Sequence, residues 1–232
     1  MKSRMLDDTK SWNPFKGCRF DCVYCKYGFR YASRMMNHRC MDCYNYVPHC
    51  HPNWLKVIPN EQGIFVCGDG DVSFCEPEFI EQIIEKIRKH NERRPFKTYY
   101  FQSKRPEYFK PYLGRFPTNV VVVTTLETNR DKGYKDVSKA PVPSKRYEQF
   151  KSLDYARKAV SIEPMMDFDI GPFLSWIHAL KPEHIWLGFN AYPHKVQIDE
   201  PGDVKVLEFM GTLKAEGIRI REKDLRGLGG RF

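Results

Sequence analysis

Three cysteines near the N-terminus are spaced closely enough to hold one metal centre. They are Cys18, Cys22 and Cys25, in a C-x3-C-x2-C arrangement. Thiolates are the usual ligands of iron–sulfur clusters, and cubane clusters commonly take four of them. Because this group offers three ligands with no obvious fourth, it suggests one iron left open for a small molecule. Structural zinc, the alternative, favours a second C-x2-C pair that closes all four positions.

A second group of cysteines and histidines follows the first. Its candidate ligands are Cys40, Cys43, His49, Cys50 and His51. A C-x2-C pair followed by histidines has the ligand types and spacing of a zinc site, although the second pair is unusually close. A second iron–sulfur cluster is the alternative, and histidine ligation favours zinc over it. The alternative to a metal site is that the thiols of Cys40 and Cys43 stay reduced and that the histidines make surface or substrate contacts.

The N-terminus turns acidic where a secretory signal would carry its apolar core, so we expect a cytoplasmic protein. In that compartment dense cysteine serves metal or redox chemistry more often than disulfides. We expect the remaining two cysteines, Cys67 and Cys75, to be bystanders. Cys67 ends an apolar run, where cysteine behaves as a small hydrophobic residue.

Composition bounds the class of protein. The chain has 232 residues, of which 41% are hydrophobic and 29% charged, an ordinary globular composition. Its longest purely apolar stretch, residues 120–123, is far too short to span a bilayer. The net charge of +9 favours an anionic partner such as nucleic acid, although a solvated basic surface is an equally weighted alternative.

Alternating strand and helix patterns must position these groups. Six short runs have the length and the β-branched or aromatic content of strands. Between them, residues 76–90 place five apolar side chains on one helical face, with a proline near the start. This order predicts a parallel α/β sheet with crossover helices. The expected strands are 63–67, 98–101, 119–125, 158–162, 184–188 and 217–221, and the further helices are 106–113, 144–153, 170–180 and 203–216.

The first cysteine motif, with Tyr24 just before its third cysteine, resembles that of the radical S-adenosylmethionine (SAM) superfamily. The resemblance implies a partial (β/α)6-type barrel with parallel strands. We expect one domain over residues 1–232, with a Cys/His-rich insertion at about 38–52.

The same resemblance implies a cofactor set. Cys18, Cys22 and Cys25 would hold a [4Fe-4S] cluster whose fourth iron is chelated by the methionyl amine and carboxylate of SAM. Reductive cleavage would give methionine and a 5′-deoxyadenosyl radical that abstracts a substrate hydrogen. The electron would come from a one-electron donor such as flavodoxin or ferredoxin.

Polar residues follow the expected strands, at the edge where parallel sheets bind ligands. Similar radical enzymes carry a Gly-Gly-Glu loop that meets the methionyl amine, and this chain departs from it with Gly68-Asp69-Gly70, for which a surface turn is the alternative. Glu163, fixed between a strand and a proline, suits a hydroxyl such as that of a ribose, or else starts a helix. The candidate cofactor-binding residues are Gly68, Asp69, Gly70, Gln102, Ser103, Lys104, Thr125, Glu127, Ser161 and Glu163.

The order of the motifs resembles one branch, the phage-associated radical SAM family of undefined activity. Trp12-Asn13-Pro14 precedes the cysteines, Lys104-Arg105-Pro106-Glu107 follows an expected strand, and Ser161-Ile162-Glu163-Pro164 comes later. The resemblance covers most of residues 10–190. This family names no substrate, so the reaction stays open.

The sequence is compatible with three functions. The excess of basic over acidic residues makes a nucleic acid or nucleotide the expected substrate of a radical enzyme. A peptide or small metabolite is the alternative, and it does not need an extended positive track around the barrel mouth. A different class is a non-catalytic, zinc-stabilised nucleic-acid-binding module. It would need Cys18, Cys22 and Cys25 to bind zinc together with a ligand from the second group.

Overall fold

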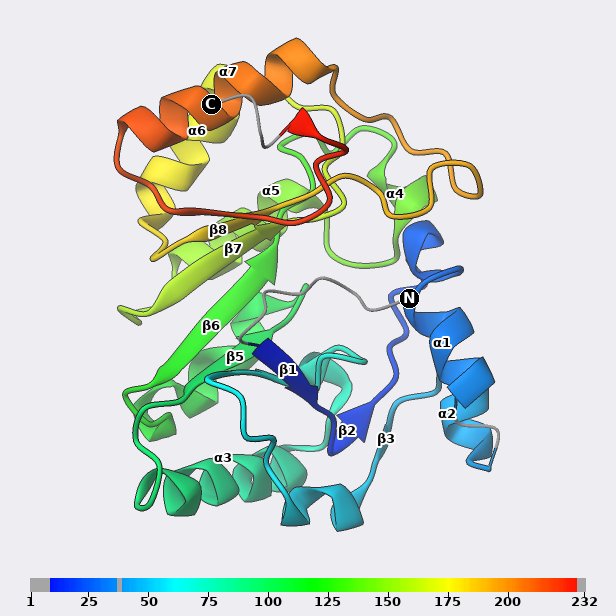
Figure 1. Ribbon diagram of the computed structural model, residues 1–232, viewed down its shortest axis with the longest axis vertical. Coiled ribbons are helices and arrows are strands. Elements are labelled where there is room, and N and C mark those ends of the chain that lie inside the picture. Colours follow the sequence, from blue (N-terminus) through cyan, green and yellow to red (C-terminus); the bar gives the residue numbers. More distant parts are fainter. Residues whose placement is uncertain (1–8, 37–38, 229–232) are drawn as a thin grey trace.

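The computed structural model describes residues 9–36 and 39–228. Within them, seven parallel strands form one sheet in the order β1-β4-β5-β6-β7-β8-β9, a half-barrel (Figure 1). The expected parallel α/β half-barrel is therefore confirmed. The strands are β1 (Thr9–Trp12), β4 (Gly63–Val66), β5 (Thr98–Gln102), β6 (Val120–Thr125), β7 (Lys158–Ile162), β8 (Ile185–Leu187) and β9 (Ile220–Glu222).

Two strands depart from the sequence expectation. β1 was not expected, because its sequence TKSW is short and polar, yet it pairs with β4 from Thr9↔Gly63 to Trp12↔Val66. β9 begins at Ile220 rather than at residue 217, because Gly217 has a φ of +77° and ends the turn after the last helix. The extra strand at the sheet edge matters for function, because the cysteine loop starts from β1.

The sheet is buried on both faces. All six residues of β6 are buried, as expected of a central parallel strand covered on both sides. Val120 and Val122 face the helix layer, and Val121 and Val123 face the barrel interior. The interior layer is completed by Phe65, Tyr100, Ala159 and Trp186.

Helices cover the outer face of the half-barrel. In α3, the five apolar side chains expected on one face are all buried. The expected helix at 106–113 is a 3-10 helix, η4, whose internal Pro111 lacks the amide hydrogen that an α-helix would use.

Beside the two-stranded sheet of β2 (Phe15–Lys16) and β3 (His49–Cys50) lie α1 and α2 (Figure 1). The helices are α1 (Phe29–Met36), α2 (Met41–Asn45), α3 (Pro77–Asn91), α4 (Tyr134–Val137), α5 (Pro143–Lys151), α6 (Ile170–Leu180) and α7 (Asp203–Ala215), and the 3-10 helices are η1 (Val23–Cys25), η2 (Pro52–Lys56), η3 (Val72–Phe74) and η4 (Pro106–Arg115). None of the described helices is both long and apolar enough to cross a membrane.

His184, at the amino end of β8, predicts an acid-sensitive step in stability. Its ring is buried, and its Nε2 has no hydrogen-bond partner among the described residues. Burial together with Arg221, Arg219 and Arg157 lowers the pKa of His184 from 6.5 to about 3. The neutral ring therefore contributes stability in full above pH 6.5, and this contribution is lost as the pH falls toward 3. Denaturant unfolding should lose up to about 1.4 kcal/mol per pH unit from this group below pH 6.5. A His184→Leu variant should show a flatter profile, and an unchanged slope would contradict the assignment.

Candidate functional site

The loop that carries the first cysteines leaves the carboxyl end of β1. Cys22 is buried and precedes the single turn of η1, which returns Cys25 toward it through the bond from the Cys25 N–H to the Cys22 carbonyl, 3.0 Å. Cys18 and Cys25 are half-buried and pack with Cys22 against Phe20. The three thiols thus share one mostly apolar patch, and their role as ligands of one cluster stays a prediction.

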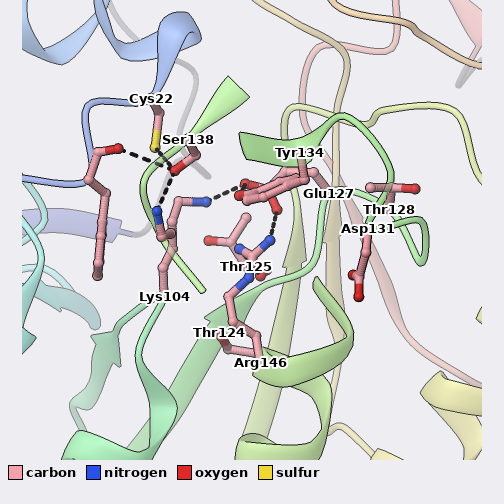
Figure 2. Close-up of polar contacts among 12 residues, drawn as sticks. Cys22, Lys104, Thr124, Thr125, Glu127, Thr128, Asp131, Tyr134, Ser138 and Arg146 are labelled. Atoms are coloured by element: carbon pink, nitrogen blue, oxygen red, sulfur yellow. Dashed lines mark hydrogen bonds and ion pairs between the residues drawn. The ribbon is translucent and has the colours of Figure 1, made fainter. Parts of the chain in front are cut away.

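The three thiols differ in pKa, and so in how readily they ionise. A hydrogen bond between the Cys22 and Cys25 thiols, helped by the charge of Lys104, lowers the pKa of Cys22 to about 6. The same hydrogen bond raises the pKa of Cys25, and burial raises that of Cys18. The Ser138 hydroxyl, 3.1 Å from the Cys22 sulfur, is a further partner (Figure 2). Cys22 is therefore the thiol most readily ionised at neutral pH.

A buried charge cluster lies beside this patch, centred on Glu127. Arg146 binds one carboxylate oxygen of Glu127 at 2.6 Å, and Lys104 binds the other (Figure 2). The same second oxygen accepts from the Tyr24 hydroxyl at 2.5 Å and from the Tyr134 hydroxyl at 3.0 Å. Burial alone would raise the pKa of Glu127, but the two cations outweigh it and lower this pKa well below its ordinary range. The cluster ties Tyr24, inside the cysteine motif, to the ends of β5 and β6.

Asp71 fixes the backbone of Lys104. Its carboxylate is buried and accepts from the Lys104 N–H at 2.8 Å and from the Ser103 hydroxyl at 2.7 Å. It also accepts from the Ser73 N–H at 3.0 Å. The segment after β4 and the segment after β5 are thereby held together, so Lys104 points toward Glu127.

The Gly68-Asp69-Gly70 loop packs directly on the cysteine loop. A Cβ at Gly70 would come within 2.6 Å of the Gly17 carbonyl, and one at Gly68 within 2.7 Å of the Ser11 hydroxyl. Asp69 forms an ion pair with Lys16 at 2.9 Å. Gly70 is therefore explained by close approach of the Gly17 backbone, and Gly68 by the adjacent Ser11 side chain. Contact with SAM stays a prediction for this loop.

Gly17 offers a direct test of this packing. It has a φ of +92°, and a Cβ there would overlap the Val47 carbonyl. We expect Gly17→Ala to displace Cys18 and to lower iron uptake severalfold in metal analysis, while thermal unfolding shows that the half-barrel still forms. Gly133→Ala, another glycine with positive φ but open space around it, is the matched control. Equal iron uptake in Gly17→Ala and wild type would contradict the packing argument.

The other predicted cofactor residues lie along the same carboxyl edge. The Gln102 side chain donates to the Thr125 hydroxyl at 2.8 Å, linking β5 to β6. Ser161 is buried at the end of β7, and the half-buried Glu163 forms an ion pair with Lys223, beyond β9. Sequence reasoning missed Asp71, Tyr134, Ser138 and Arg146, whose types and spacing carry no ligand pattern.

The second group of cysteines and histidines converges on one point. The donor atoms of Cys40, Cys43, His49 and His51 all lie within 4.8 Å of one another. The Cys43 sulfur is 3.3 Å from His49 Nε2 and 3.2 Å from His51 Nε2, and the Cys40 sulfur is 3.5 Å from His49 Nε2. These four residues could hold a metal ion, as the sequence predicted.

Cys50 does not belong to this convergent set. It lies on β3 between the two histidines, and neighbouring side chains of a strand point to opposite faces. Its thiol instead packs against the core and forms a hydrogen bond with the thiol of Cys75. The strand geometry thus separates one predicted ligand from the other four.

The first three cysteines fit an iron–sulfur cluster better than a single ion. Among the described residues, no group with donor atoms converged within 4.8 Å includes Cys18, Cys22 or Cys25. Thiolates of a cubane bind different irons and so need not meet at one point. The donor set is all thiol, one of its members ionises readily, and the surroundings are apolar.

Comparison with solved structures shows which fold this is. No protein-family profile matches the chain, and no curated protein does. The chain is similar to Streptococcus suis SuiB bound to precursor peptide SuiA, with a TM-score of 0.59 and 8% identity over 93% of this chain and 48% of that one. It is also similar to a radical SAM methyltransferase from Sphaerobacter thermophilus, with a TM-score of 0.58 and 16% identity over 97% of this chain and 69% of that one. The fold is a half-barrel like the partial barrel of radical SAM enzymes.

A third solved structure is also similar in fold at low sequence identity. It is to native anSMEcpe with bound AdoMet and Cp18Cys peptide, with a TM-score of 0.51 and 12% identity over 92% of this chain and 62% of that one. The chain therefore spans about half of the first structure's length and about two thirds of the other two. At these identities the likeness concerns the half-barrel fold alone.

Proposed function

We propose that the chain is a radical SAM enzyme that holds a [4Fe-4S] cluster on Cys18, Cys22 and Cys25. The observation that carries this proposal is the place of these thiols, on the loop after β1 at the carboxyl edge of a radical SAM half-barrel. The other cysteines have other partners: Cys40 and Cys43 converge with two histidines, while Cys50, Cys67 and Cys75 lie close together in the core. Three ligands leave one iron open for SAM.

When bound, the cluster supplies the electron that cleaves SAM to methionine and a 5′-deoxyadenosyl radical, which abstracts a substrate hydrogen. The protein contributes charge and shielding. Lys104 keeps a positive charge near the Cys22 thiolate, because Glu127 raises the pKa of this lysine against the effect of burial. Phe20, Phe74 and Tyr134 surround the thiols with apolar surface and exclude water.

The two glutamates predicted to bind the cofactor are suited to different roles. Both oxygens of the fully buried Glu127 are engaged by the protein, so it positions Lys104 and Tyr24. Glu163 is half-buried just after the end of β7 and forms an ion pair with Lys223. We therefore assign SAM ribose binding to Glu163. The other residues that we propose to contact SAM at the carboxyl edge of the sheet are Gln102, Ser103, Thr125 and Ser161.

The experiment that tests the enzyme class is electron paramagnetic resonance of the reconstituted, reduced protein. Adding SAM should change the cluster spectrum, because SAM would bind the open iron, and Glu163→Gln should require a higher SAM concentration for the same change. A zinc-stabilised binding module would instead yield a colourless protein indifferent to SAM. That outcome would overturn the proposal.

The finer family assignment rests on three motifs. The Asn13 side chain of Trp12-Asn13-Pro14 accepts the Asp69 N–H at 3.1 Å, so this motif joins the cysteine loop to the loop after β4. With the Lys-Arg-Pro and Glu-Pro motifs at the ends of β5 and β7, it supports placement in the phage-associated radical SAM branch. A flavodoxin or ferredoxin would be its electron donor.

Ion pairs along the carboxyl edge bear on the substrate class. The pairs are Arg30 and Lys139 with Asp21, Arg130 with Asp167 and Asp169, Lys205 with Asp167, Lys223 with Glu163, and Arg226 with Glu200. Because these cations already have acidic partners, the local charge favours a peptide or small metabolite over an extended polyanion. A nucleic acid or nucleotide, suggested by the net charge of +9, is the competing substrate class. An oligonucleotide whose affinity falls steeply with salt would reverse this preference.

For the second group we propose Zn²⁺. A tetrahedral zinc with ordinary bonds to sulfur and nitrogen places its ligand atoms about 3.3–3.8 Å apart. Three of the sulfur–nitrogen separations, 3.2–3.5 Å, are close to this spacing, and all the donor atoms lie within 4.8 Å of one another. His49 directs Nε2 at the site because its Nδ1 lies 2.7 Å from the Val47 carbonyl, a contact of the kind that orients metal-binding histidines.

A further inference from the structure

The Cys/His site is joined to the loop that carries Cys18 by a continuous set of backbone contacts. At one end, the His51 N–H donates to the Pro14 carbonyl at 2.5 Å. Next, β2 and β3 pair antiparallel, with Phe15 opposite Cys50 and Lys16 opposite His49. The segment that leads to the first cysteine therefore runs alongside the two histidines.

The contacts continue to Cys18 itself. The Val47 carbonyl lies against Gly17, too close for any side chain. The Cys18 N–H donates to the Tyr46 carbonyl at 3.4 Å. Tyr46 follows α2 in a left-handed conformation, with a φ of +58°, and its own N–H bonds back to the Cys43 carbonyl at 3.1 Å. Cys18 is thus held by the turn that immediately follows a thiol of the second site.

Besides the Cys/His group, the 39–51 segment is held by α1, where the Ser33 hydroxyl donates to the Cys43 carbonyl at 2.7 Å, and by the buried side chain of Tyr46. Its helix α2 has five residues, of which Cys43 is the buried one, and it begins without a side-chain cap. So short a helix is marginal without tertiary support. Met41, Tyr44 and Val47 are exposed. The Cys/His group brings Cys43 of α2 next to His49 of β3.

We infer that Zn²⁺ bound by Cys40, Cys43, His49 and His51 is a structural ion that orders residues 14–18 and thereby presents Cys18 for cluster assembly. The inference extends the proposed function, because it gives the second site a role in building the first. Zinc clamps α2 to β3, β3 holds β2 in register, and the turn at Tyr46 and Val47 holds Gly17 and Cys18.

Hydrogen–deuterium exchange of the full chain tests the ordering, independently of any cluster or activity. The protein is compared before cluster reconstitution with zinc present, after removal by a chelator, and after zinc is added back. We expect the peptide containing residues 14–18 to exchange about tenfold faster without zinc, the effect of losing local backbone protection. Re-addition should restore protection. Exchange of this peptide that does not respond to zinc would overturn the inference.

Variants extend the test to the cluster. Cys40→Ser should lose zinc and then take up severalfold less iron during reconstitution. Cys50→Ala is the matched control, because Cys50 lies on β3 beside the ligand His49 but packs against the core, and this variant should keep both metals. Iron in place of zinc at the second site, or full iron uptake by a zinc-free Cys40→Ser protein, would contradict the inference. A wild type that shows the zinc-dependent protection but never binds iron would instead refute the proposed function alone.

Discussion

Cys22→Ala is expected to abolish formation of 5′-deoxyadenosine from SAM. Cys22 is the buried central thiol of the motif, and its lowered pKa, about 6, makes it the thiolate most available to iron at neutral pH. Without it, Cys18 and Cys25 are left as two ligands. We expect iron content after anaerobic reconstitution to fall severalfold and the product to fall to the background of a protein-free mixture.

The control for this variant is Cys75→Ala. Cys75 is also buried, but it lies near Cys50 and Cys67, away from the loop. This variant should keep iron and product formation. If Cys22→Ala formed 5′-deoxyadenosine at the wild-type rate, the assignment of the cluster ligands would be wrong.

Glu127→Gln is expected to cause the largest loss of stability. Glu127 and Arg146 both have fully buried side chains, and Lys104 is largely buried. The amide would leave two buried cations without a negative partner, a change that typically costs about 3–5 kcal/mol in free energy of unfolding. Chemical denaturation followed by circular dichroism measures this loss.

An exposed ion pair provides the comparison. Glu85 on α3 pairs with Arg88 and Lys89 at the protein surface, and Glu85→Gln should change the free energy of unfolding by about 1 kcal/mol or less. Equal effects of the two substitutions would show that the buried cluster contributes no more than a surface pair.

The low pKa of Glu127 also sets a direction for pH. Because its folded pKa lies well below the ordinary value of 4.5, its stabilising contribution is complete above that pH and is lost as the pH falls below it. Glu127→Gln should therefore be less sensitive to acid than wild type in this range. An identical acid profile would contradict the role given to Glu127.

The fold was predictable where periodicity was strong. The apolar face of α3 and the all-valine start of β6 are local patterns, and the structure confirms both elements. β1 was not predictable, because three of its four residues are polar and the strand forms through pairing with β4. η4 differs from the expected helix because Pro111 interrupts α-helical bonding.

The candidate site was predictable only where spacing carried chemistry. Spacing alone identified two candidate ligand groups: the motif of Cys18, Cys22 and Cys25, and the pair of Cys40 and Cys43. Arg146 lies on a helical segment and resembles any solvated basic residue until the fold buries it against Glu127. For Cys50 the sequence could not tell which face of a two-residue strand each side chain would take.

The most direct test of the account is an anaerobic assay for 5′-deoxyadenosine. Protein reconstituted with iron and sulfide would be mixed with a reductant and SAM, and the product would be quantified against the Cys22→Ala variant. The account predicts a brown wild-type protein that forms 5′-deoxyadenosine and a variant that does not. A fully reconstituted wild type that forms no product above the variant would contradict it.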